Sequence, residues 1–194
     1  MTATANSFLR AKHWQIFLLV FLLPYSLEFV ATIQLPTKIW SWRDVGPWGV
    51  LFLGSMLFHI LCVVFWLGAM GSFLNSIVKP ELQMDERFFR FSLVYPVIYM
   101  PIFFPLLLSD ILLSKNFIWP LHLACMACLF YLLYFVSRCF GLVEKEKPVS
   151  FYDYAGPFFL LWFFPLGIWI IQPKVNRLYA ERNIAASLAA QSTA

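Results

Sequence analysis

Charged residues are scarce in this chain. Only 12% of its 194 residues are Asp, Glu, Lys or Arg, whereas 61% are apolar, and the mean hydropathy is +0.76. A soluble domain has about half of its residues apolar and about a quarter charged. A chain of this length cannot bury so much apolar surface in its own core. The composition therefore excludes an ordinary soluble domain and predicts that a lipid bilayer surrounds most of the protein.

Three further absences narrow the class of protein. The net charge is only +4 and is spread among loops, so we expect it to orient the protein in a membrane rather than to bind nucleic acid. No pair of cysteines lies in a loop, so a disulfide framework is not expected. The first apolar stretch, which follows Arg10 and Lys12, is longer than that of a signal peptide and lacks a small-x-small cleavage site, so we interpret it as a membrane anchor.

Long apolar segments are what the chain has in abundance. A helix of about 20 apolar residues spans the hydrocarbon layer of a bilayer, and four segments meet this requirement. We predict an all-α membrane protein whose crossing helices lie at residues 14–33, 48–74, 91–113 and 117–140. In the second helix, Gly68 and Ser72 stand one turn apart beside Gly71, and such small residues allow close helix contact.

A fifth apolar segment, residues 155–171, is shorter and is interrupted by proline and glycine. If it crosses the membrane, the 14 Lys and Arg residues divide into eight on one side and six on the other. If it dips in and returns, Lys174, Arg177 and Arg182 change sides, and the division becomes eleven and three. Positive residues favour the cytoplasmic side. We therefore predict a re-entrant or interfacial segment, a cytoplasmic tail at 172–194 and two cytoplasmic termini, with five crossing helices as the alternative.

Three prolines, Pro96, Pro101 and Pro105, lie inside the third predicted span. Each proline removes a backbone hydrogen bond, and its ring clashes with the carbonyl four residues earlier. In hydrocarbon the freed carbonyls need partners from neighbouring helices or from a water-lined cavity. The spacing therefore predicts a bent or partly unwound helix.

Four ionisable side chains lie inside the predicted spans, namely Glu28, His59, Asp110 and His122. Such side chains are costly at membrane depth and by default mark functional sites. At about 1.5 Å per residue, Glu28, Asp110 and His122 each lie roughly 6–8 Å below the outer boundary, and His59 lies one to two turns deeper. Three helices thus bring ionisable groups to one level, which predicts a shared polar site near the outer face.

Several ligands suit such a site. Glu28, Asp110 and His122 supply two carboxylates and an imidazole, which are ligands of divalent metals such as Zn²⁺, Mn²⁺ or Fe²⁺. Together with His59 the same groups could instead form a proton relay or hold a cationic ligand. The simpler alternative is that both carboxylates reach the interface while both histidines find partners in the bundle. The rotation of the helices decides between these interpretations.

Redox and haem sites receive less support. His122, Cys125 and Cys128 recur every three residues, a spacing that drifts around a helix, so the three side chains do not converge on one metal. The two cysteines resemble the pair of quinone-linked thiol oxidoreductases, but those enzymes need a second, exposed pair. Buried cysteines usually act as small hydrophobes. His59 and His122 have different expected depths, which argues against a shared haem.

Three short segments of the sequence carry a resemblance to a group of known proteins. They are Lys-His-Trp-Gln at 12–15, Pro-Leu-His-Leu at 120–123 and the aromatic stretch at 151–173 that contains Trp-Phe-Phe-Pro-Leu-Gly-Ile-Trp. In these phrases the chain resembles small uncharacterised multi-pass membrane proteins of Bacteroidetes-type bacteria. The resemblance covers much of the second half and a little of the start. It implies a location in the bacterial inner membrane and supplies no activity.

The function expected from the sequence is non-enzymatic. We find no nucleotide-binding loop, no catalytic-triad spacing, no cysteine-rich metal motif and no internal repeat of the kind found in transporters. These observations favour an accessory, assembly or small-ligand-binding subunit that contacts the lipid bilayer and other membrane subunits. The alternative is a membrane-embedded enzyme, or a carrier of metal or protons, that uses the Glu/Asp/His cluster with the proline-rich helix as its wall.

Overall fold

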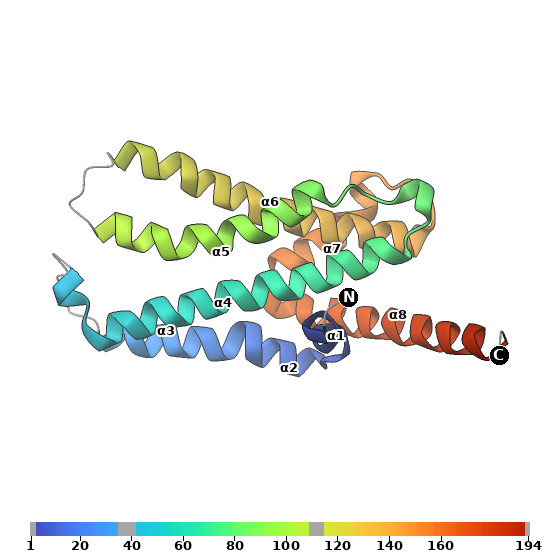
Figure 1. The fold of residues 1–194 in the computed structure, drawn as a ribbon, viewed down its shortest axis with the longest axis horizontal. Coiled ribbons are helices and arrows are strands. Elements are labelled where there is room, and N and C mark those ends of the chain that lie inside the picture. The colour runs from blue at the N-terminus through green and yellow to red at the C-terminus, as the bar shows by residue number, and fades with distance from the viewer. Residues whose placement is uncertain (1–2, 35–41, 109–114, 193–194) are drawn as a thin grey trace.

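The structure is a computed structural model that describes residues 3–34, 42–108 and 115–192 (Figure 1). Every secondary-structure element in these ranges is helical, which confirms the predicted all-α class for them. The elements are α1 (Ala3–Arg10), α2 (His13–Phe17), the π-helix η1 (Leu18–Leu22), α3 (Leu23–Gln34), α4 (Trp42–Ile77), the 3₁₀ helix η2 (Pro80–Leu82), α5 (Arg87–Leu108), α6 (Lys115–Lys145), α7 (Phe151–Trp162) and α8 (Phe164–Ser192).

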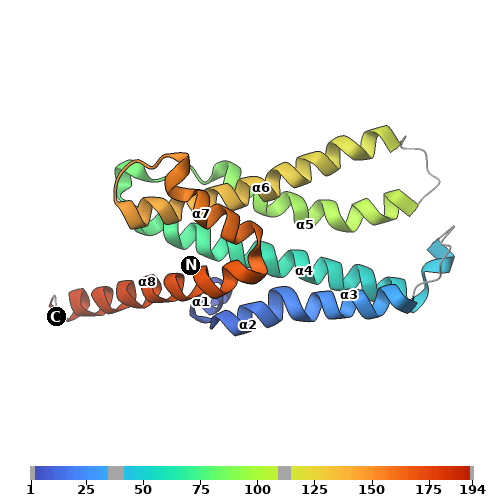
Figure 2. The same ribbon diagram turned by 180° about the vertical axis from the view of Figure 1, so that it is seen from behind.

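Three stretches of the described helices are long and apolar enough to cross a membrane, namely His13–Gln34, Gly46–Ile77 and Ile118–Lys145. Three of the predicted spans, 14–33, 48–74 and 117–140, coincide with these helices to within a few residues. Two antiparallel hairpins result, α3 against α4 and α5 against α6. Both ribbon views show the hairpins together near α7 and diverging toward the opposite end (Figures 1 and 2).

The proline-rich helix α5 is continuous from Arg87 to Leu108 and contains Pro96, Pro101 and Pro105. Figure 1 shows it as a curved ribbon, so bending rather than unwinding accommodates the prolines. A side chain of α5 also bonds to the backbone of α6, because the Tyr95 hydroxyl donates to the Leu121 carbonyl at 3.1 Å. This hydrogen bond joins α5 to α6 beside the prolines.

Gly71 allows a very close contact between α4 and α5. A Cβ atom added there would lie 2.4 Å from Cζ of Phe89. Phe89 cannot move aside easily, because it is fully buried and stacks on Phe135 with ring centroids 4.1 Å apart. Gly68 is less crowded, with Leu93 at 3.2 Å from an added Cβ. The small-residue face predicted from sequence therefore packs within the chain.

Replacement of Gly71 by Ala is expected to destabilise the protein by about 1–3 kcal/mol, because the new methyl group overpacks the Phe89–Phe135 stack. Gly54→Ala is the matched control in the same helix, since an added Cβ at Gly54 meets nothing within 4 Å. Thermal unfolding in one detergent measures both variants. Equal unfolding temperatures for the two variants would contradict the packing described here.

The chain reverses between α7 and α8. The helix α7 begins at Ser150, whose backbone N–H and hydroxyl both donate to the Asp153 carboxylate at 2.8 and 2.9 Å. These hydrogen bonds lower the pKa of the Asp153 carboxyl below its ordinary value. The helix ends at Phe163, where ψ is 54°. At Gly167 an added Cβ would lie 1.8 Å from the Leu160 carbonyl oxygen, so only glycine permits this tight return.

The reversal brings the C-terminus back toward the end from which α7 departs. In Figures 1 and 2 the end of α8 lies at the same end of the molecule as the connections from α4 to α5 and from α6 to α7. The predicted segment 155–171 therefore contains the end of α7, the turn and the beginning of α8.

Gln172 holds α8 in place. It is completely buried, and its Oε1 accepts a hydrogen bond from Trp66 Nε1 of α4 at 2.9 Å. Its Nε2 donates to the carbonyls of Phe8 and Ala11 at 2.9 and 3.1 Å. One turn later, Asn176 donates to the Ala11 carbonyl at 3.0 Å. Carbonyls at the end of a helix have no partner within it, so α8 caps α1 and joins it to α4.

Replacement of Gln172 by Leu is expected to lower the stability by about 2–4 kcal/mol, because it leaves the buried Trp66 N–H and Phe8 carbonyl without partners. Gln191→Leu, an exposed position of the same helix, is the control and should leave the unfolding temperature unchanged. Thermal unfolding followed by tryptophan fluorescence measures both. A Gln172→Leu protein that unfolds with the control would contradict this role.

Candidate intramembrane site

The structure pairs two of the four predicted ionisable residues. Nδ1 of His59, on α4, lies 3.5 Å from Oε1 of Glu28, on α3. Their side chains retain only 15% and 18% of their full exposure. Oε1 of Glu28 is buried and has no hydrogen-bond partner among the residues that the structure describes. A carboxylate and an imidazole thus face each other inside two helices that are able to cross a membrane.

Aromatic rings enclose this pair. The Tyr25 ring meets His59 edge to face, with centroids 4.9 Å apart, and Phe21 packs against Tyr25 at 4.9 Å. Phe164, the first residue of α8, lies 6.1 Å from His59 and 5.7 Å from Phe21. The turn between α7 and α8 therefore borders the site.

The π-helix η1 lies directly before Pro24. A proline ring clashes with the carbonyl four residues earlier, which here belongs to Val20 in the middle of η1. The wider π turn accommodates that clash, and such turns occur frequently at functional sites. Pro24 thus accounts for the local geometry that precedes Tyr25 and Glu28.

Glu28 and His59 lie at one level, which corrects the expectation that His59 is one to two turns deeper. That expectation assumed that the outer ends of the first two spans coincide. The stretch Gly46–Ile77 has 32 residues, whereas His13–Gln34 has 22. His59 lies 13 residues after Gly46, whereas Glu28 lies six residues before Gln34. Because α4 thus extends farther than α3 at the end where α3 leads into α4, counting residues from each end gave the wrong relative depth.

His122 has different neighbours. On α6, its Nδ1 lies 3.4 Å from the Tyr99 hydroxyl of α5, and its ring lies 5.1 Å from that of Phe103. Within the described ranges, Glu28 forms its ion pair with His59. His122 is not part of that pair and contacts Tyr99 instead.

The predicted metal set of Glu28, Asp110 and His122 stays a prediction, because Asp110 lies outside the described residues. Among the residues that the structure does describe, no three His, Cys, Asp or Glu side chains gather as metal ligands would. The four cysteines are buried and unbridged, Cys125 and Cys128 included.

Sequence reasoning missed Tyr25 and Tyr99, the aromatic partners of the two histidines. A signal for Tyr25 was present, since it precedes Glu28 by three residues and so shares its helix face. No comparable signal linked Tyr99 to His122, because that contact depends on how α5 and α6 pack.

No family model, curated protein or solved structure matches the chain. The fold and the site define its class instead: a helical protein whose described residues include three helices able to cross a membrane, with a carboxylate–imidazole pair between two of them.

Nuclear magnetic resonance of protein labelled with ¹⁵N-histidine tests the separation of the two histidines. We expect Glu28→Gln to shift the ring signals of His59 and to leave those of His122 in place, because only His59 contacts the carboxylate. Tyr99→Phe is the reciprocal variant and should shift only His122. A shift of the His122 signals in Glu28→Gln would contradict the described geometry.

Proposed function

We propose that this chain is a non-enzymatic, multi-pass membrane protein, an accessory or small-ligand-binding subunit, in which the Glu28–His59 pair takes up and releases a proton. The observation that carries the proposal is the buried Oε1 of Glu28, which has no hydrogen-bond partner within the described ranges and lies 3.5 Å from His59 Nδ1. Ionisable groups inside a membrane are costly and are retained where they have a function.

The chemistry of the pair suits a proton better than a metal ion. A neutral imidazole and a protonated carboxyl, or an imidazolium and a carboxylate, both have zero net charge. When the pair gains or loses one proton, its net charge changes by one unit. The apolar interior of the membrane stabilises such a charge poorly. A structural metal site in a protein usually has four ligands and a catalytic one at least three, whereas this pair supplies two.

The proposal includes a topology of four crossing helices with a re-entrant α7–α8 hairpin. The 22 residues of α5 reach about 33 Å, enough for the hydrocarbon layer, and α5 runs beside α6. The eleven-to-three division of Lys and Arg supports cytoplasmic termini. The resemblance to inner-membrane proteins of Bacteroidetes-type bacteria supports an inner-membrane location.

A proton carrier is the second candidate. It is favoured by the contact between Phe164, at the start of α8, and His59, because many transporters place interrupted helices beside their ion sites. In this candidate the proton that Glu28 and His59 bind is passed across the membrane.

Infrared spectroscopy of the protein in liposomes tests the proton site. As the pH falls, we expect a C=O stretch from a protonated carboxylic acid that is missing from Glu28→Gln and that appears at a different pH in His59→Gln. Glu144→Gln is the control, because Glu144 lies outside the site and pairs with Lys174 at 3.0 Å. Superimposable titrations of wild type and Glu28→Gln would contradict the proposal.

A pH-sensitive dye enclosed in the same liposomes separates the two candidates. A carrier acidifies the lumen when a membrane potential is imposed, and Glu28→Gln abolishes that acidification. A binding subunit gives the infrared signal of Glu28 without proton flux.

A further inference from the structure

A polar cavity of about 420 Å³ lies beside the connection between α4 and α5. Its lining residues are distant in sequence from Glu28 and His59. Its walls come from residues 81–85, from α6 and from the segment after α6. Its polar or charged lining residues are Glu81, Gln83, Asp85, Tyr131 and Arg138.

Arg138 supplies the cationic side of the cavity. Its guanidinium donates through Nη1 to the Tyr134 hydroxyl, and its Cζ lies 5.8 Å from the centroid of that ring. Its Nε is buried and has no hydrogen-bond partner in the described part of the chain. A buried N–H of a charged group without a partner is unfavourable, so an acceptor oxygen near Arg138 would stabilise the site.

Two carboxylates supply the opposite charge. Asp85 accepts a hydrogen bond from the Arg87 backbone N–H at 2.9 Å, and its side chain remains 73% exposed. Glu81 is also exposed. A purely anionic ligand would meet Arg138 and also both carboxylates. A zwitterion, with its anion at Arg138 and its cation at Asp85 and Glu81, is complementary to the whole cavity.

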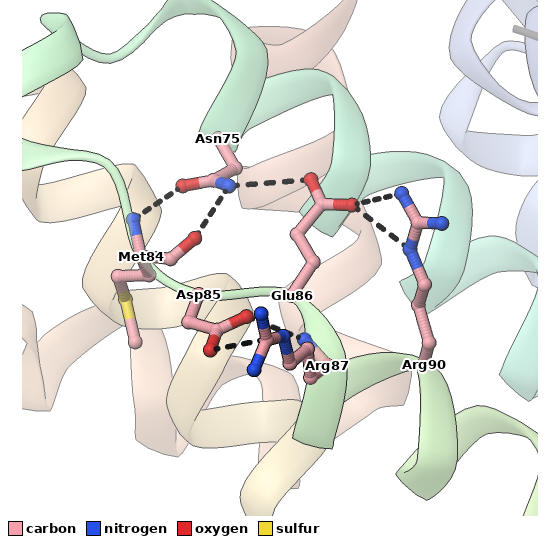
Figure 3. A network of polar contacts seen from close by, with 6 residues as sticks. All are labelled: Asn75, Met84, Asp85, Glu86, Arg87 and Arg90. Atoms are coloured by element: carbon pink, nitrogen blue, oxygen red, sulfur yellow. Dashed lines mark hydrogen bonds and ion pairs between the residues drawn. The ribbon is translucent and has the colours of Figure 1, made fainter.

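Hydrogen bonds fasten the segment that carries Asp85 to α4 (Figure 3). The buried Asn75 of α4 accepts a hydrogen bond from the Met84 N–H at 2.9 Å and donates to the Met84 carbonyl at 3.0 Å. It also donates to Glu86 at 3.2 Å, and Glu86 in turn pairs with Arg90 at 2.9 Å. The segment that carries Glu81 and Asp85 is thus fastened to α4 before any ligand binds, which lowers the entropy cost of binding.

The cavity lies at the level of lipid headgroups in the proposed topology. Arg138 precedes the end of α6 at Lys145 by seven residues, or about 10 Å. The polar connection from Lys79 to Glu86 covers the same end of the bundle. A basic side chain at this depth reaches toward the phosphates of the membrane.

An apolar track leads away from the cavity. Tyr131, in the cavity wall, meets Phe88 edge to face with centroids 4.5 Å apart. From Phe88 a row of exposed apolar side chains follows one face of α5, spaced three or four residues apart: Phe88, Phe91, Val94, Ile98 and Ile102. An acyl chain that lies along this row would keep its headgroup at the cavity.

From these observations we infer that the cavity binds a phospholipid with a phosphoethanolamine headgroup, its phosphate at Arg138 and its ammonium at Asp85 and Glu81. The phosphate supplies acceptor oxygens for the guanidinium. The ammonium supplies hydrogen-bond donors for the carboxylates, which a trimethylammonium group lacks. An acyl chain lies along the apolar row of α5.

Native mass spectrometry of the full-length protein tests this assignment. Protein in detergent micelles receives equimolar dioleoyl phosphatidylethanolamine, phosphatidylcholine and phosphatidylglycerol, and the bound lipids are counted. We expect phosphatidylethanolamine to be preferred, and Arg138→Gln to weaken its binding about tenfold, the effect of one lost charge-assisted hydrogen bond. The control Arg177→Gln, whose side chain on α8 is 74% exposed and pairs with Glu181, keeps wild-type binding.

A second variant and a soluble headgroup complete the test. If Arg138→Gln does not fold, Glu81→Gln replaces it, and the ratio of bound phosphatidylethanolamine to phosphatidylglycerol should fall. Preference for phosphatidylglycerol in the wild type, or an unchanged ratio in Glu81→Gln, would overturn the charge complementarity. Soluble glycerophosphoethanolamine is the final arm. If it binds as tightly as the lipid, the acyl track has no role and the ligand is a free headgroup.

Discussion

The buried amide of Gln172 is the contact on which the arrangement of the other helices depends. It links three parts of the chain that are distant in sequence: the end of α1, the middle of α4 and the first half of α8. In an apolar interior an unpaired amide, indole N–H or carbonyl is costly. Here the Gln172 amide bonds to the Trp66 indole and to two carbonyls at the end of α1. These hydrogen bonds restrict the position of α8 in an otherwise apolar bundle.

This restriction determines where the turn between α7 and α8 lies. Gln172 is eight residues after Phe164, the first residue of α8. Because Gln172 must meet Trp66 and the end of α1, Phe164 is placed near the α3–α4 hairpin and beside His59. Gly167 allows the return, since any larger residue would strike the Leu160 carbonyl. The hydrogen bonds of Gln172 and the Glu28–His59 pair are therefore linked through the beginning of α8.

Composition and apolar runs were sufficient to predict the fold class and three of the long helices, because the length of a membrane-spanning helix follows from bilayer thickness. The ionisable residues in those helices made Glu28 and His59 candidates, because charge in hydrocarbon is rare, and the structure places their side chains 3.5 Å apart. Their pairing depends on how far α4 extends beyond α3 at the end where α3 leads into α4, and no local pattern encodes that offset.

Other features depended on packing and had weaker signals. The small residues Gly68, Gly71 and Ser72 indicated close helix contact, but only the structure identifies Gly71 and its partner Phe89. Gln172 was one polar residue in an aromatic tail, and its significance comes from partners about 100 and about 160 positions away. Arg138 entered the sequence reasoning as one positive charge among fourteen, and its cavity requires the fold of the α4–α5 connection.

The returning hairpin is the central claim, and labelling of single cysteines with a membrane-impermeant maleimide tests it most directly. Three exposed positions serve as probes: Gln34 at the outer end of α3, Glu81 between α4 and α5, and Ser192 at the end of α8. In spheroplasts, we predict that Gln34→Cys reacts at once. Glu81→Cys and Ser192→Cys should react only after the membrane is permeabilised. Reaction of Ser192→Cys together with Gln34→Cys would show that the segment crosses the membrane and would contradict the account.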